Sequence, residues 1–413
     1  CLRNIAASSR LLTALGFVIN ENKSSLIPSK SYRFLGFRFD TKNFAVSIPS
    51  EKREKLLHKT LSILGKKSCK ICLFASFIGS LISVCPAVKY GLLHTKILER
   101  EKFLALLSSN DFEAEMLLLL SIREDLLWWK AVFSNPHQCN FISSSRFELE
   151  IFTDASLTGW GAICTGVHTH GFWPPRDRQF HINYLELLAV FHGLRCFVSH
   201  LRGCNILLRV DNSTALLYVN RMGSVQFPLL SSLAREIWCW CADSDLFLYA
   251  AYIPSAQNLA DAHSRIISDE TEWSLSQIHF NKIEENFGPF DIDLFASSIN
   301  TKCVRFVSWV PDPEALAVDA FSLDWSKFYF YAFPPFILIL RVLHKIILDR
   351  AEGIMVVPRW LAQPWFPLFN QLTINQPIFF EANINMLSSP FRDYHPAWSS
   401  LSLVVAKLSA RPS

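Results

Sequence analysis

The chain has 413 residues, of which 50% are hydrophobic and 18% are charged, with 34 Phe and 12 Trp. This composition excludes a disordered chain, and the length allows two to four domains of roughly 100–200 residues each. Forty Lys and Arg against 36 Asp and Glu give a net charge of +4. So small an excess does not by itself indicate nucleic-acid binding.

Cysteine usage and the apolar stretches bear on the compartment. The 11 Cys are odd in number and follow no repeating spacing, which favours reduced thiols. The N-terminal CLRNIAASSR lacks the order of a secretory signal, and the apolar stretch 328–340 is too short to span a membrane. We therefore expect an intracellular protein of the cytoplasm or nucleus, neither secreted nor membrane-bound. Because the sequence begins with Cys1, we also expect it to be part of a longer chain.

The predicted secondary structure of the N-terminal third changes at about residue 49, from one helix with short strands to helices alone. A helix over 2–15 ends at Gly16, and strands are expected at about 32–40 and 43–48. Residues 49–134 carry apolar positions at helical spacing with few breakers, which predicts an all-helical region. Polar residues 135–145 predict a linker.

From Arg146 the pattern changes to strands alternating with helices, which predicts an α/β layer with a mixed five-stranded sheet and flanking helices over 146–268. Charged residues 269–285 predict a second connector. Residues 286–378 mix short apolar strands with a helix, which predicts a smaller α/β module. Residues 379–413 show no clear pattern and are expected to be a tail. The predicted fold class is thus a multidomain α/β protein.

Four acids lie at comparable places in the predicted α/β layer: Asp154 in IFTDAS, Glu186 in YLELL, Asp211 in LRVDNS and Asp261 in NLADAHSR. Asp154 and Asp211 end apolar strands, and the other two lie near helix starts. Carboxylates with such apolar neighbours repel one another unless a divalent cation joins them, and Mg²⁺ prefers oxygen ligands. Two ions about 3.5–4 Å apart support phosphodiester cleavage, so these residues predict a metal-dependent nuclease. The alternative for any one acid is a helix cap or a turn residue.

The motifs FTDAS, GWGA, NYLELLAV, VDNSTAL and NLADAHSR, in this order, resemble the ribonuclease H domain of reverse transcriptases, especially those of DIRS-type retrotransposons. The resemblance implies a ribonuclease H-like fold over 146–268 and cleavage of the RNA strand of RNA–DNA hybrids, with specificity from 2′-hydroxyl contacts. It implies that the four acids bind two Mg²⁺ or Mn²⁺ ions. Asn212 and Ser213 would cap a helix or contact a substrate phosphate. Such relatives often carry a histidine before the last acid, where this chain reads IPSAQ at 253–257.

GFVINENKS at 16–24 and YRFLGF at 32–37 resemble the end of a reverse transcriptase palm and its primer-gripping hairpin. In that case Lys23 and Arg33 would neutralise phosphates, residues 1–48 would end the palm, and residues 49–134 would form the thumb and connection. No paired-aspartate polymerase motif precedes Leu15, so the implied partner is an upstream palm and fingers of the same polyprotein. An ordinary hairpin is the alternative.

Downstream, FGPFDIDLFASSIN at 287–300, WVPDP at 309–313 and YAFPPF at 331–336 resemble the segment that follows the ribonuclease H domain in DIRS-type elements. That segment is similar to phage-type DNA adenine methyltransferases, in which a polar residue before Pro-Pro holds the target amino group of an unstacked base. Phe333 occupies this position and cannot accept a hydrogen bond. No glycine-rich cofactor loop lies near Asp291 or Asp293. We therefore expect a degenerate methyltransferase-like module over 286–378.

Three functions remain open at this point. The first is a retroelement ribonuclease H, which the four intact acids favour. The second is an inactive retroelement fragment with a nucleic-acid-binding or structural role. The third is a DNA adenine methyltransferase, which Phe333 disfavours.

Overall fold

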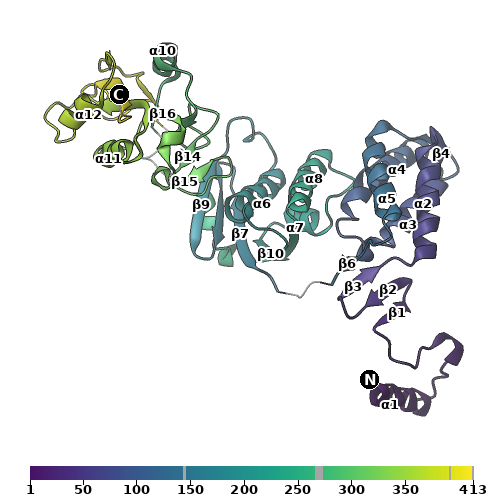
Figure 1. Cartoon of the computed structure of the whole chain (residues 1–413). Helices are drawn as coiled ribbons and strands as arrows, with labels where there is room; N and C mark the ends of the chain where they lie inside the picture. Colours follow the sequence, from purple (N-terminus) through teal and green to yellow (C-terminus); the bar gives the residue numbers. More distant parts are fainter. Residues whose placement is uncertain (143–145, 266–272, 390–391, 412–413) are drawn as a thin grey trace. The chain divides into compact units, whose positions relative to one another are not determined.

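The computed structural model describes residues 1–142, 146–265, 273–389 and 392–411 (Figure 1). Two compact units are present: residues 1–147 with 218–243 form the first, and residues 148–217 with 244–413 form the second. The segment 218–243 therefore groups with the N-terminal region, although the sequence patterns assigned it to the α/β layer. Within the described ranges, no helix combines the length and apolar character that crossing a bilayer requires.

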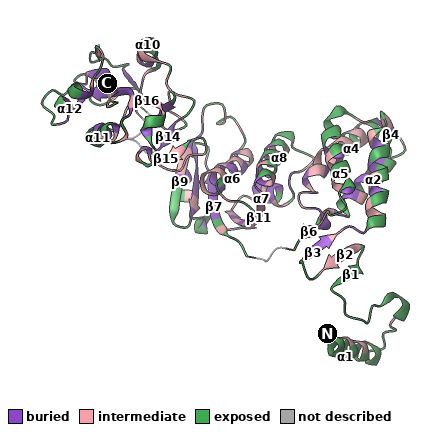
Figure 2. Cartoon of the chain, in the orientation of Figure 1, coloured by how far each residue is buried: buried purple, intermediate pink, exposed green. Residues whose placement is uncertain are grey.

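The first unit begins with a helix and a small antiparallel sheet. Helix α1 (Leu2–Ala14) has no buried residue (Figure 2). The short helix η1 (Glu21–Lys23) follows, and then the strands of a sheet in the order β1-β2-β3-β6. Leu35 and Gly36 join β1 to β2 with positive φ angles of 48° and 80°, as a type I′ hairpin turn requires. The strands are β1 (Ser31–Phe34), β2 (Phe37–Asp40), β3 (Ala45–Ser47) and β6 (Asn140–Phe141).

The rest of the first unit is helical, as expected, apart from the strand pair β4 (Ser68–Lys70) and β5 (Glu115–Leu117). The residues Phe74, Leu81 and Trp129 form part of its apolar core. The guanidinium of Arg235, on α8, donates to both carboxylate oxygens of the fully buried Asp125, on α5, at 2.8 and 3.3 Å. The helices are α2 (Ser50–Leu64), α3 (Ile71–Ile82), η2 (Cys85–Ala87), η3 (Leu93–Thr95), α4 (Lys96–Ser109), η4 (Leu120–Ile122), α5 (Arg123–Ser134) and α8 (Pro228–Asp243).

The second unit contains the expected mixed five-stranded sheet, in the order β11-β10-β7-β8-β9. Strands β7, β8 and β9 form an antiparallel meander, whereas β10 is parallel to both β7 and β11. Helix α6 packs on β7 and β8, and its Leu185 joins Trp160 and Trp173 in one apolar core. The elements are β7 (Leu149–Ala155), β8 (Gly159–Cys164), β9 (Val167–Phe172), α6 (Ile182–Val198), β10 (Asn205–Val210), β11 (Phe247–Tyr252), η5 (Ser255–Gln257) and α9 (Asp261–Ser264). Helix α7 (Ser213–Asn220) begins in this unit, and its last three residues group with the first unit.

Gly161 allows α9 to lie against this sheet. It faces Asp154 across the β7–β8 pairing, and a Cβ atom at Gly161 would lie 2.6 Å from the Ser264 nitrogen and 2.8 Å from the Ala260 oxygen. Real Cβ contacts are essentially never so short. Because Gly161 has no side chain, α9 can pack directly on β8. This packing places Asp261, the first residue of α9, towards β7, the strand that carries Asp154.

The same unit carries a second five-stranded sheet, in the order β13-β16-β17-β20-β18. Strands β13, β16 and β17 are parallel, and β20 runs antiparallel between β17 and β18. The further elements are β12 (Ser274–Leu275), α10 (Gln277–Phe287), β13 (Ile292–Asp293), β14 (Val307–Ser308), β15 (Ala317–Val318), η6 (Ala320–Ser322), η7 (Trp325–Lys327), β16 (Tyr329–Ala332), η8 (Phe336–Leu338), α11 (Ile339–Asp349), β17 (Glu352–Pro358), α12 (Phe366–Leu372), β18 (Ile378–Phe380), β19 (Leu387–Ser388) and β20 (Leu403–Ser409).

The structure corrects two expectations in this region. Residues 379–413 are not simply a tail, because they supply β20, an internal strand of the second sheet. Val404 packs in the core on one face of this sheet and Val405 in the core on the other, so β20 lacks the polar–apolar alternation that marks a half-exposed strand. The expected connector over 269–285 lies partly outside the described residues, and its later part forms α10.

Candidate metal centre

Three of the four acids meet at one edge of the first sheet of the second unit. Asp154 lies near the end of β7 and Asp211 directly follows β10, and these parallel strands pair Phe152 with Arg209. The same register, continued by two residues, places Asp154 beside Asp211. Glu186 enters from α6. One carboxylate oxygen of each acid lies within 4.8 Å of the others.

Two of these carboxylates are buried in apolar surroundings. Asp154 is 3% exposed and Glu186 is 6% exposed. Burial, together with the charges of Asp211 and Asp261, raises the pKa of Asp154 to about 6. Burial and the charges of Asp154 and Asp211 raise the pKa of Glu186 to about 9. The metal-free site therefore disfavours full ionisation.

The donor set fits a divalent cation. Asp154 Oδ2 and Glu186 Oε2 are buried and have no hydrogen-bond partner in the described part of the protein. Leaving a buried acceptor unsatisfied costs about 1–3 kcal/mol, and more for a charged group. A set of carboxylate oxygens suits hard ions such as Mg²⁺ and Mn²⁺. A cation held by Asp154, Glu186 and Asp211 would satisfy both oxygens and relieve the repulsion among the acids.

Asp261 lies outside this group of three. Its side chain is about one-third exposed and accepts a hydrogen bond from Arg265 Nη2 at 2.7 Å. Its charge still raises the pKa of Asp154 and of Glu186, because α9 packs on β7 and β8. Its role as a fourth ligand stays a prediction.

Asn258 is a buried polar residue of the site to which sequence reasoning gave no role. Its amide Nδ2 donates to the Thr153 carbonyl at 3.0 Å and lies 3.5 Å from Asp154 Oδ1. Its Oδ1 accepts from the Ala260 amide at 3.2 Å, so Asn258 links β7 to the start of α9. The sequence feature that could have indicated this role is a polar residue three positions before Asp261, separated from it only by the apolar Leu259 and Ala260.

The predicted nucleic-acid contacts lie in different parts of the chain. Asn212 Nδ2 donates to Asn183 Oδ1 and its Oδ1 accepts from the Ala215 amide, both at 3.0 Å, so Asn212 caps α7 and contacts α6. Ser213 is exposed at the start of α7. In the first unit, Lys23 is exposed in η1 and Arg33 pairs with Glu51 at 2.9 Å. Roles for these four residues in binding substrate stay predictions.

A cavity of about 680 Å³ lies in the second unit, lined in part by Phe333, Pro334, Pro335 and Phe336. The Phe333 and Phe336 rings lie 6.3 Å apart, edge to face. The buried Asp293 carboxylate accepts from the amides of Phe295 and Lys302 at 3.3 and 3.1 Å. The cavity thus offers an aromatic wall but no polar group at position 333.

The region around Asp154 thus combines a mixed five-stranded sheet with a cluster of three acids beside the ends of its central strands. Comparison with solved structures finds ribonuclease H domains among the similar proteins. The N-terminal ribonuclease H domain of a Mycobacterium tuberculosis protein is 16% identical, with a TM-score of 0.24, and the match covers 28% of this chain and 88% of that one. Ribonuclease H1 from Halobacterium salinarum NRC-1 is 15% identical over 28% of this chain and 91% of that one, with a TM-score of 0.23.

A foamy viral protease-reverse transcriptase, solved in complex with an RNA/DNA hybrid, is 12% identical with a TM-score of 0.30. The match covers 65% of this chain but only 35% of the viral protein. The family described as DNA N-6-adenine-methyltransferase (Dam) matches residues 264–387, less than a third of the chain. No curated protein matches.

Proposed function

We propose that residues 146–268 form a divalent-metal-dependent ribonuclease H that cleaves the RNA strand of RNA–DNA hybrids. The observation that carries this proposal is the convergence of Asp154, Glu186 and Asp211, from three separate elements. Two of their buried carboxylate oxygens have no hydrogen-bond partner among the residues that the structure describes. The five ordered sequence motifs supply the choice of an RNA–DNA hybrid as substrate. The end of this region, 266–268, lies outside the described residues.

Each residue contributes through its position. Asp154 and Glu186 offer buried oxygens from β7 and α6, and Asp211 adds a less buried carboxylate from the end of β10. When bound, divalent cations supply the positive charge that stabilises in-line phosphodiester hydrolysis. Asn258 holds the chain before α9 against β7, which keeps Asp261 near the cluster. We propose two ions, Mg²⁺ or Mn²⁺, with Asp261 as the fourth ligand.

The finer assignment is also a proposal. The order of motifs supports a DIRS-type retroelement polyprotein in which residues 1–48 end the palm, residues 49–134 form the thumb and connection, and an upstream palm and fingers are the partner. In this context the protein acts inside the cell, in the cytoplasm or nucleus, and Lys23 and Arg33 contact the nucleic-acid backbone.

The test uses the full chain with a hybrid whose RNA strand is labelled. We expect cleavage with Mg²⁺ or Mn²⁺, and duplex DNA left intact. Asp154→Asn should lower the rate by at least about 100-fold, as expected for a group that acts on the reacting charge. Glu148→Gln, which removes an exposed carboxylate of the same unit, should retain activity. A folded protein that cleaves in neither metal over a range of salt, or an undiminished Asp154→Asn variant, would refute the proposal.

A second candidate, DNA adenine methylation, has the family match over 264–387 and the 680 Å³ cavity in its favour. The residue before Pro334 does not fit it, because Phe333 supplies no acceptor for a base amino group. We propose that this module keeps the fold without methyl transfer. Calorimetry of the full chain with S-adenosylmethionine should show no binding, whereas a dissociation constant in the low micromolar range, roughly −8 kcal/mol, would contradict a degenerate site.

A further inference from the structure

A pair of asparagine side chains connects the two segments that carry Glu186 and Asp211. Asn212 Nδ2 donates to Asn183 Oδ1 at 3.0 Å. Asn212 directly follows Asp211 in the chain. Asn183 precedes Glu186 by three residues within α6, so these two side chains lie on the same face of the helix, one turn apart. The amide bridge therefore lies beside the place where the two carboxylates approach each other.

Other hydrogen bonds fix the orientation of both asparagines. Asn212 Oδ1 accepts from the Ala215 amide at 3.0 Å, so only its nitrogen is left to face Asn183. The backbone amide of Asn183 donates to His181 Nδ1 at 3.2 Å, which caps the start of α6. The bridge thus joins the first turn of α6 to the first turn of α7, with a defined donor and a defined acceptor.

This bridge spans the same gap across which the carboxylates repel each other. One oxygen of Glu186 and one of Asp211 lie within 4.8 Å of each other. Burial, together with the charges of Asp154 and Asp211, raises the pKa of Glu186 to about 9. Ionised acids at this distance act to separate α6 from the end of β10. Because the asparagine amides carry no charge, this repulsion does not weaken the bond between them.

The neighbouring pair of acids has a comparable amide contact. Asn258 Nδ2 donates to the Thr153 carbonyl at 3.0 Å and so fastens the segment before Asp261 to β7, the strand of Asp154. An uncharged side-chain amide therefore joins two acid-bearing segments at two separate places around the cluster. This arrangement resists the separation of the acids when no metal is bound.

We propose that Asn183 and Asn212 are positioning residues of the metal centre, whose bridge holds Glu186 and Asp211 at the spacing of a metal site before the cation binds. The inference rests on the proposed function and deepens it, because the same acids hold the metal. It gives Asn212 a role within the protein in place of the expected contact with a substrate phosphate. A site that is already arranged binds its ligand more tightly, because less ordering is needed on binding.

The test titrates the full chain with Mg²⁺ alone, by calorimetry without substrate. N183A removes the acceptor of the bridge and leaves the cap of α7 in place. N212S keeps a hydroxyl that caps α7 but is too short to reach Asn183. Each variant should bind Mg²⁺ about tenfold more weakly, the lower end of the range for residues that hold metal ligands in place. The double variant N183A/N212S should bind no more weakly than either single variant, because all three lose the same bond.

The control is N286A, which removes an exposed asparagine of α10 whose amide bonds only within its own helix, and it should leave the affinity unchanged. In hybrid cleavage, the Mg²⁺ concentration for half-maximal rate should rise about tenfold in N183A and N212S. The maximal rate should fall by less than about threefold, because saturating metal refills the site. This split separates positioning of the ligands from a direct contact with the reacting phosphate.

Unchanged Mg²⁺ affinity in N183A and N212S, with only a lower melting temperature in EDTA, would reduce the bridge to a structural role and overturn the proposal. Losses that add in the double variant would also overturn it, since the two side chains would then act separately. If N183A does not fold, N212S, which retains the cap, decides the question. A chain that binds Mg²⁺ without cleaving hybrids would refute the nuclease proposal, whereas the affinities of the variants would still decide this one.

Discussion

At the scale of single residues, the acidic cluster combines a cost in stability with a capacity for binding metal. Asp154 and Glu186 are buried beside other carboxylates, which raises the pKa of the first to about 6 and of the second to about 9. A group that ionises less readily in the folded protein than in the unfolded chain weakens folding once the pH exceeds its unfolded pKa. Burial of these carboxylates therefore lowers the stability of the metal-free protein, and a bound cation would offset that loss.

Asp154→Asn should stabilise the metal-free protein at neutral pH. In the unfolded chain the Asp154 carboxyl ionises near pH 4, whereas in the folded protein it keeps its proton up to about pH 6. Its contribution to the free energy of unfolding therefore falls between these values, and its removal should add about 1–3 kcal/mol at pH 7 and little at pH 4. Urea unfolding in EDTA at both pH values measures this, with Glu148→Gln as control. A less stable variant at pH 7 would contradict the electrostatic account.

The same acids should link metal binding to pH. A cation must displace the protons that Asp154 and Glu186 still hold, so the affinity for Mg²⁺ should rise from pH 6 to pH 9 and binding should release protons. Calorimetry in two buffers of different ionisation enthalpy counts the released protons. Glu186→Gln should weaken the affinity and reduce proton release. Binding independent of pH would place the metal elsewhere.

At the scale of elements, the approach of α9 to β8 depends on Gly161. Gly161→Ala should cost about 1–3 kcal/mol, because the new Cβ would meet backbone atoms of Ser264 and Ala260, which cannot rotate away. Displacement of α9 should also reduce cleavage, since Asp261 moves with it. Gly79→Ala is the matched control: nothing lies within 4 Å of its Cβ position in α3, so it should be neutral or stabilising by up to about 1 kcal/mol. Equal stabilities for both variants would refute the tight contact.

At the scale of the whole molecule, the grouping of 218–243 with residues 1–147 makes the first unit dependent on a segment from the middle of the chain. Asp125 is fully buried and is held by Arg235 and by His94 Nδ1, the latter at 2.8 Å. Arg100 also donates to the Val225 carbonyl at 2.6 Å. Residues 146–268 therefore do not correspond to one compact unit, because 218–243 groups with the N-terminal region.

Removing Arg235 should destabilise the first unit. Arg235→Gln leaves the buried Asp125 carboxylate without its bidentate partner, which should cost about 3 kcal/mol. Arg123→Gln, on an exposed side chain, is the control and should have little effect. Thermal unfolding of the full chain, followed by hydrogen exchange of α5 and α8, measures the change. Unaltered protection of α8 in Arg235→Gln would show that this ion pair does not hold the segment.

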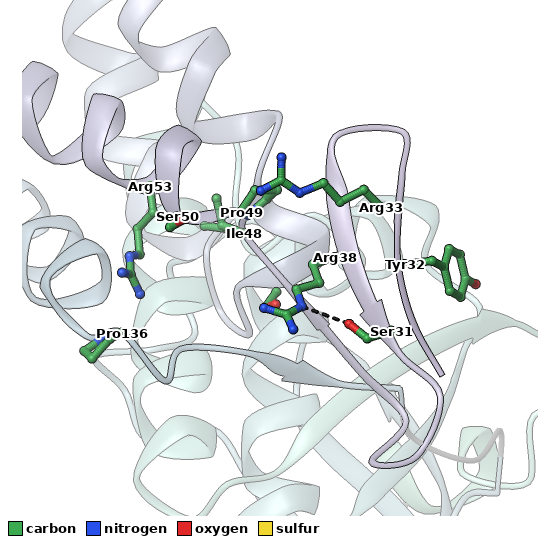
Figure 3. Close-up of a pocket in the computed structure, with 10 residues that line it drawn as sticks. Ser31, Tyr32, Arg33, Arg38, Ile48, Pro49, Ser50, Arg53 and Pro136 are labelled. Atoms are coloured by element: carbon green, nitrogen blue, oxygen red, sulfur yellow. Dashed lines mark hydrogen bonds between the residues drawn. The ribbon is translucent and has the colours of Figure 1, made fainter. Parts of the chain in front are cut away.

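Local patterns in the sequence were enough to predict the mixed five-stranded sheet and the three acids that meet at the ends of its strands. Apolar strands ending in Asp154 and Asp211, and an amphipathic helix carrying Glu186, specify a sheet edge where carboxylates meet, because periodicity of side chains is a property of neighbouring residues. Only the tertiary structure decided which distant segments pair. Three features bring together residues that no local sequence pattern connects. They are the Arg235–Asp125 ion pair, the internal position of β20 and a cavity of the first unit lined by Arg38 and Arg53 (Figure 3). Such contacts depend on how complementary surfaces pack, and no single segment carries that information.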